Sequence, residues 1–201
     1  MTLPIAVCVS GRGSNLQALI DAIAERRLDA RIVFVASSKK NAPALDRAIA
    51  AGIPCRAFPP AANGGRDAAQ ALMAAAIVAE GAELVVLAGY DRILSDGFWE
   101  RLGDIPVINI HPSLLPLYGG LGMMGLKVHE AVLAAGERET GATVHRAHRG
   151  MLDAGEILVQ RRVPVLPADD AEALNARVLA VEHEILVEAV GRLAARSAVR
   201  S

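Results

Sequence analysis

Residues 5–20 read IAVCVSGRGSNLQALI, an apolar run that ends in a glycine-containing turn and continues into an amphipathic segment. The run Ile5–Val9 has the length and the branched side chains of a buried strand. From Asn15 to about Arg26 apolar residues recur at helical spacing. A strand, a tight turn and a helix in this order form the first half of a βαβ unit, which predicts an α/β fold.

The same alternation of strands and helices continues along the chain. It predicts strands at 31–36, 55–58, 84–87 and 107–110, with helices at 43–51 and 66–80. An irregular loop over 111–126 is then followed by a helix at 128–135, strands at 142–147 and 157–165, and a closing helix at 170–194. We therefore predict a mostly parallel, twisted sheet with helices on both faces, which is a Rossmann-like arrangement.

Length, charge and cysteine content argue against several classes of protein. The 201 residues fit one domain, and a formal net charge of -1 lacks the basic footprint of a nucleic-acid-binding protein. No apolar run reaches the roughly 18 residues that a membrane span needs, and no signal-peptide pattern opens the chain. We expect Cys8 and Cys55 to be buried thiols in the cytoplasm, with a disulfide as the weaker alternative.

The glycine-containing turn, Gly11-Arg12-Gly13-Ser14-Asn15, is a candidate phosphate-binding loop. Glycines let the backbone approach an anion, and the amides of the following helix point at it. A plain tight turn with a helix cap is the alternative. A dinucleotide site fits less well, because Leu16 replaces the third glycine of that motif and no acidic residue follows the second predicted strand.

Polar side chains capable of acid–base chemistry follow later strands. Asn109 and His111 are two residues apart at a strand end, so their side chains point to the same side. An amide beside an imidazole can stabilise an oxyanion and move a proton, although a lone histidine can also simply cap or pack. Asp153, on a glycine-bearing loop, is either an orienting carboxylate or a turn residue. The loops at 10–15, 89–94 and 109–117 all lie at the carboxyl ends of strands, where open α/β sheets bind ligands.

Three segments carry a family resemblance. Residues 11–18 (GRGSNLQA), 88–95 (AGYDRILS) and 109–116 (NIHPSLLP) resemble the motifs of the folate-dependent phosphoribosylglycinamide formyltransferases, also called glycinamide ribonucleotide transformylases. The resemblance extends from Ile5 to about Val190. It implies one formyltransferase domain over 1–201, with a phosphate-binding half at 1–106 and a catalytic and folate-binding half at 107–201.

The resemblance also implies an activity, its small-molecule partners and the residues that serve it. The implied reaction moves a formyl group from 10-formyltetrahydrofolate to the amine of glycinamide ribonucleotide, without a metal, a nucleic acid or a membrane, in a monomer or homodimer. The implied catalytic residues are Asn109, His111 and Asp153. The residues implied to bind the nucleotide substrate are Gly13, Ser14, Asn15 and Glu182. The residues implied to bind folate are Arg66, Leu87, Arg92, Ile93, Leu94 and Asn109.

The sequence departs from the family pattern in three places. Asp91 stands where many members carry methionine, and the loop at 117–127 is longer than the shorter family form. The stretch from His145 to Asp153 is also longer than the family pattern, by about one residue. The alternatives are a sister folate-dependent formyltransferase, a formyltetrahydrofolate hydrolase and a non-catalytic nucleotide-binding module.

Overall fold

The computed structural model describes residues 2–200, with side chains described for residues 2–197. It divides into two compact units. The first contains the chain up to Ile108 together with the chain from Val190 onward, and the second contains Asn109–Ala189. The single domain over 1–201 and its halves at 1–106 and 107–201 stay predictions.

The first unit is built on a parallel sheet, as the alternation of elements predicted. Strand β1 pairs in parallel with both β2 and β4, and β2 pairs in parallel with β3, so the order is β3-β2-β1-β4, with β5 next. The bounds are Leu3–Val9 for β1, Ala30–Ser37 for β2, Cys55–Ala57 for β3, Leu84–Leu87 for β4 and Val107–His111 for β5.

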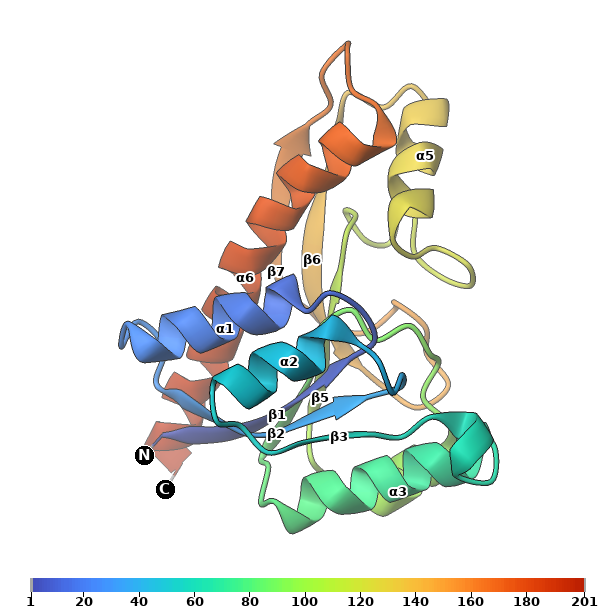
Figure 1. Cartoon of the computed structure of the whole chain (residues 1–201). Coiled ribbons are helices and arrows are strands. Elements are labelled where there is room, and N and C mark those ends of the chain that lie inside the picture. Colours follow the sequence, from blue (N-terminus) through green and yellow to red (C-terminus); the bar gives the residue numbers. More distant parts are fainter. Residues whose placement is uncertain (1, 201) are drawn as a thin grey trace. The chain divides into compact units, whose positions relative to one another are not determined.

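Helices cover both faces of this sheet. Figure 1 shows α1 and α2 over one face and α3 over the opposite face. Ile5 of β1, Leu16 of α1 and Met73 of α3 are fully buried, so apolar side chains fill both layers. The bounds are Ser14–Ala24 for α1, Pro43–Ala50 for α2, Pro60–Ala62 for the 3-10 helix η1, Arg66–Ala79 for α3 and Asp96–Leu102 for α4.

The second unit is built on an antiparallel hairpin. Strand β6 (Glu139–Ala147) pairs antiparallel with β7 (Ile157–Pro164), and the register shifts between Val144 and His145. Such an irregularity re-aims the side chain at that point, here His145. Helix α5 (Leu126–Ala134) precedes the hairpin, and α6 (Ala171–Arg200) follows it and ends in the first unit.

The predicted elements are all present, with differences at their ends. Strand β6 begins at Glu139, three residues before the predicted start, and α6 extends to Arg200. Asp170 caps α6, because its side chain accepts a hydrogen bond of 2.8 Å from the Ala173 amide. Helix α4 was missed because it is short, although its Ser95 cap, which accepts from the Phe98 amide, is a recognisable start signal.

Both cysteines are free thiols, as expected, but only one is fully buried. Burial raises the pKa of Cys8 to about 12. Cys55 is half-buried rather than buried because it lies on β3, the edge strand of the sheet. Among residues 2–200 no helix combines the length and the apolar character that crossing a membrane requires.

Candidate active site

The glycine-containing loop between β1 and α1 presents uncapped amides. Gly13 occupies the N-cap position of α1 with φ +75°, and no side chain caps the helix from that position. The first amides of a helix lack intrahelical partners and carry a partial positive charge. Ser14 is half-buried and Asn15 is buried in the first turn of α1. The geometry is therefore suited to an anion such as a phosphate.

Helix α2 holds this loop in place from the side. The Ala44 amide donates to the Gly11 carbonyl at 3.1 Å, and Arg47 Nε donates to the Arg12 carbonyl at 2.8 Å. A Cβ on Gly13 would lie 2.5 Å from the Ala44 Cβ, which is closer than carbon atoms can approach. The position after Arg12 therefore needs glycine both for its backbone conformation and for the packing of α2.

A polar cluster of Ser10, Ser38, Lys39 and Asp91 connects the carboxyl ends of three strands in the first unit. The hydroxyls of Ser10 and Ser38 lie 2.7 Å apart, and the Asp91 amide donates to Ser10 at 2.9 Å. Ser38 donates to Asp91 at 3.0 Å, and Lys39 forms an ion pair with Asp91 at 2.5 Å. Asp91, the departure from the family pattern, thus has specific partners.

The charge of Asp91 follows from these partners. Its partial burial raises the pKa of the carboxyl, but hydrogen bonds from Lys39, Ser10 and Ser38 and the Lys39 charge outweigh burial, so the pKa lies below its usual range. Asp91 is consequently ionised at neutral pH and neutralises Lys39.

Residues 90–95, in the segment that resembles a folate-pocket motif, are held against α3 by Gln70. This side chain is 3% exposed, and its amide nitrogen donates to the Tyr90 hydroxyl at 3.2 Å and to the Ile93 carbonyl at 3.1 Å. Its oxygen accepts from the Ser95 amide at 2.6 Å. Sequence reasoning missed Gln70, although a polar residue on the apolar face of an alanine-rich helix is the signal that marks it.

The residues with predicted folate roles in the first unit differ in accessibility. Arg92 and Ile93 are exposed on the loop after β4, Leu94 is half-buried there, and Leu87 is buried in the strand behind them. Arg66 is exposed at the first position of α3. Ile93 is 46% exposed, which leaves it accessible to a ligand.

In the second unit, Asn109, His111 and Asp153 lie together. Asn109 Nδ2 donates to Asp153 Oδ1 at 3.3 Å, and His111 Nδ1 lies 3.7 Å from Asp153 Oδ2. The Gly120 amide donates to the same carboxylate at 2.9 Å. Asp153 lies between β6 and β7 with φ +51°, a conformation that residues other than glycine rarely adopt. The structure therefore brings the three predicted catalytic residues into one polar cluster.

Asp153 is ionised in this cluster. Burial raises the pKa of its carboxyl, but the hydrogen bond with His145, the Gly120 amide and the nearby His111 and His145 side chains lower the pKa further than burial raises it. A carboxylate held in this way can orient an imidazole and compensate a positive charge on it.

His145 is a fourth member of the cluster. It is 2% exposed, and its Nδ1 donates to the Arg146 carbonyl at 2.9 Å. Its Nε2 lies 3.1 Å from Asn109 Nδ2 and 3.5 Å from Asp153 Oδ1. The register shift in β6 directs this side chain to Asn109, and a single sequence does not reveal such a shift.

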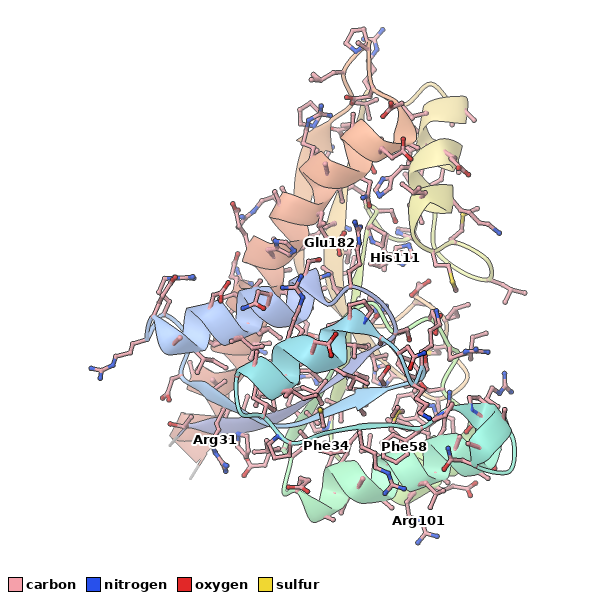
Figure 2. The ribbon with its side chains drawn as sticks, in the orientation of Figure 1. Arg31, Phe34, Phe58, Arg101, His111 and Glu182 are labelled. Carbon is pink, nitrogen blue, oxygen red and sulfur yellow. The ribbon has the colours of Figure 1, made fainter. Side chains whose placement is uncertain are left out.

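Glu182 is buried on α6, in the second unit. Its side chain is 6% exposed, and Figure 2 marks it together with His111 of the same unit. A buried carboxylate on a helix is uncommon and is a reason to consider a binding role. Among the residues whose side chains are described, no group of three or more His, Cys, Asp or Glu could hold a metal ion.

His129 on α5 is fully buried, and neither ring nitrogen has a hydrogen-bond partner. Burial lowers the pKa of this imidazole, and the nearby His111 lowers the pKa further. The Asn175 side chain raises the pKa, although it forms no hydrogen bond with either ring nitrogen. The folded protein therefore favours neutral His129.

We expect this imidazole to make folding pH-dependent. As the pH falls below about 6.5, His129 gains a proton in the unfolded chain before it does in the folded protein, so the free energy of unfolding falls. At neutral pH the free energy of unfolding of His129→Leu is expected to lie within about 1.5 kcal/mol of the wild-type value. The variant should lose less stability on acidification, as measured by urea unfolding at a series of pH values. Parallel pH dependences for the two proteins would contradict this expectation.

Known proteins are similar to this chain in sequence and in fold. The formyl transferase family model matches residues 3–190. The phosphoribosylglycinamide formyltransferase of Escherichia coli (strain K12) is 38% identical over 181 residues, which cover 90% of this chain and 82% of that protein. The crystal structure of glycinamide ribonucleotide transformylase 1 from Symbiobacterium toebii superposes with a TM-score of 0.88 at 38% identity, over 96% of this chain and 88% of that one.

A longer relative matches through one segment. The trifunctional purine biosynthetic protein adenosine-3 of Drosophila melanogaster is 40% identical over 191 residues. The match covers 94% of this chain but only 14% of the fly protein, so this chain spans about one seventh of that relative.

Proposed function

The chain belongs to the formyl transferase family, and from this premise we propose that it transfers a formyl group from 10-formyltetrahydrofolate to the amine of glycinamide ribonucleotide in purine synthesis. The observation that carries the proposal is the polar cluster of Asn109, His111 and Asp153, in which Asp153 Oδ1 accepts a hydrogen bond from Asn109 at 3.3 Å and Oδ2 lies 3.7 Å from His111 Nδ1.

The proposed reaction is a direct acyl transfer. The substrate amine attacks the formyl carbon, a carbon–nitrogen bond forms, and the carbonyl electron pair moves to the oxygen. Asn109 and protonated His111 stabilise this oxyanion, and Asp153 compensates the imidazolium charge. As the intermediate collapses, the bond to the folate nitrogen breaks, that nitrogen takes up a proton, and the attacking nitrogen loses one through the His111 and Asp153 pair.

The residues proposed to bind each substrate are assigned by the chemical character of their side chains and backbone groups. We assign the nucleotide phosphate to Gly13, Ser14 and Asn15, because uncapped helix amides suit an anion. Glu182 is assigned to the same substrate, as a buried acceptor for its hydroxyl or amine groups.

The folate is assigned mainly to the loop after β4. Arg92, Ile93 and Leu94 combine a cation with accessible apolar surface, and Leu87 lies behind them in β4. Arg66 is assigned to the anionic tail of the folate, because it is an exposed cation at the start of α3. Asn109 would contact the folate at the formyl group.

The cysteines indicate the cellular compartment. The free thiols of Cys8 and Cys55 fit a reducing compartment, so we place the protein in the cytoplasm. We expect a monomer or homodimer that acts on small molecules.

A transfer assay tests the proposed function. Purified protein is mixed with 10-formyltetrahydrofolate, with and without glycinamide ribonucleotide, and release of the deformylated folate is followed by absorbance. Release that depends on the nucleotide is the expected result. Release without the nucleotide would instead identify a hydrolase, and a folded protein that releases nothing in either mixture would refute the proposal.

A further inference from the structure

His111 has a second polar contact that the proposed chemistry does not use. Its Nε2 lies 2.8 Å from the Tyr118 carbonyl oxygen. A carbonyl only accepts hydrogen bonds, so Nε2 must carry a hydrogen. In the neutral ring this places the lone pair on Nδ1, so the second proton, which makes the imidazolium of the proposed reaction, enters at the nitrogen that faces the Asp153 carboxylate. The Tyr118 carbonyl thus selects one of the two tautomers of the candidate catalytic imidazole.

The backbone of Tyr118 is held in an unusual conformation. Its φ is +54°, in the left-handed region that bulky residues rarely adopt. Among residues 2–200 only Arg26, Tyr118 and Asp153 share this property without being glycine, and the last two both contact His111. A bulky residue held in this region at a contact of the imidazole is typical of functional sites, whereas aspartate adopts the region more readily.

Three hydrogen bonds hold Tyr118 in this conformation. Its phenol donates to Glu137 at 2.8 Å, just before β6. On one side the Ser113 hydroxyl donates to the Leu117 carbonyl at 2.6 Å, and on the other the Gly120 amide donates to Asp153 at 2.9 Å. The bond to Glu137 also raises the pKa of the phenol, so Tyr118 remains a donor into the alkaline range.

We propose that Tyr118 is a positioning residue for His111: its phenol is anchored to Glu137, and its carbonyl thereby holds His111 in the Nε2-protonated tautomer with Nδ1 toward Asp153. The effect on tautomer is independent of the reaction. Its effect on rate rests on the proposed function, because only then does the orientation of His111 determine catalysis.

Substitutions of Tyr118 and of Glu137, the two partners of the phenol hydrogen bond, distinguish this positioning role from an effect of side-chain packing. Tyr118→Phe keeps the ring and removes the donor, and Glu137→Ala removes the acceptor. Glu137→Gln keeps an oxygen that can accept from the phenol, so it serves as the conservative rescue. Glu139→Gln is the matched control, because Glu139 is an exposed carboxylate two residues further on that pairs with Arg162.

Two measurements decide the proposal. The first is the nitrogen spectrum of histidine-labelled protein, recorded well above the ordinary histidine pKa of about 6.5, with the His111 signals identified by their loss in His111→Ala. The second is kcat and the KM for each substrate in the transfer assay.

In Tyr118→Phe and Glu137→Ala we expect the Nδ1-protonated form of His111 to appear and kcat to fall about tenfold, with each KM within about twofold of the wild type. Glu137→Gln and Glu139→Gln should keep the wild-type spectrum and rate.

Two outcomes would overturn the proposal. The first is an unchanged tautomer signal in Tyr118→Phe, whatever happens to the rate, and the second is a changed tautomer with an unchanged kcat. A wild-type protein without transfer activity would refute the proposed function, while the nitrogen signals would still decide whether Tyr118 sets the tautomer.

Discussion

Replacing His111 by alanine is expected to lower kcat for formyl transfer by about a thousandfold, the loss typical of removing a group that stabilises a developing oxyanion or moves a proton. The effect should fall on kcat because the charge that His111 stabilises exists only in the transition state. The imidazole is 4% exposed and contacts Asp153 and the Tyr118 carbonyl. Its removal therefore also deprives the ionised Asp153 carboxylate of one of its partners.

Two controls make this result interpretable. Thermal unfolding followed by circular dichroism should show that the variant folds, since Asp153 retains the Gly120 amide and Asn109 as partners. His148→Ala removes an exposed histidine and should leave kcat within about twofold. A His111→Ala protein that keeps more than about a tenth of the wild-type rate would rule out the proposed role.

The second large effect is expected at Gly13. An alanine there would have to adopt φ +75°, and its Cβ would lie 2.5 Å from Ala44. Left-handed strain of about 1–2 kcal/mol and the displacement of α2 should distort the amides to which we assign the phosphate. We expect the KM for the nucleotide substrate to rise about a hundredfold, which corresponds to about 2.7 kcal/mol. The KM for 10-formyltetrahydrofolate should change far less.

Gly11→Ala provides the comparison within the same loop. A Cβ at Gly11 meets no atom within 4 Å, and this glycine does not have a positive φ. Its substitution should therefore raise the nucleotide KM much less than Gly13→Ala does. Equal effects of the two alanines, or an equal rise in both substrates' KM values for Gly13→Ala, would show that this loop does not hold the phosphate.

The sequence predicted contacts that depend on local geometry. Asn109 and His111 share one strand, so their common side followed from the alternation of a β-strand. The tight turn that leads directly into a helix followed from a strand, two glycines and an amphipathic segment in direct succession, and its binding of phosphate stays a prediction. Asp153 was found because the glycine-bearing loop before a strand resembles the family pattern, and its position beside His111 was not deducible from spacing.

Contacts between distant segments were not predictable. Asp91 and Lys39 are 52 positions apart, and their ion pair depends on which strands are neighbours and on how far each side chain reaches. Gln70 contacts residues 90–95 through the packing of α3, and Tyr118 contacts His111 only because its backbone is left-handed. Each of these depends on tertiary packing, which a single sequence specifies only indirectly.

The cluster of Ser10, Ser38, Lys39 and Asp91 has a consequence for the affinity of the first unit for its ligands. Its hydrogen bonds and ion pair connect the ends of β1, β2 and β4 through the protein's own groups. A loop that is already fixed loses little conformational entropy when a molecule binds to it. More of the interaction energy therefore appears as affinity, and the strand ends of this unit act as a preorganised surface rather than one assembled by its ligand.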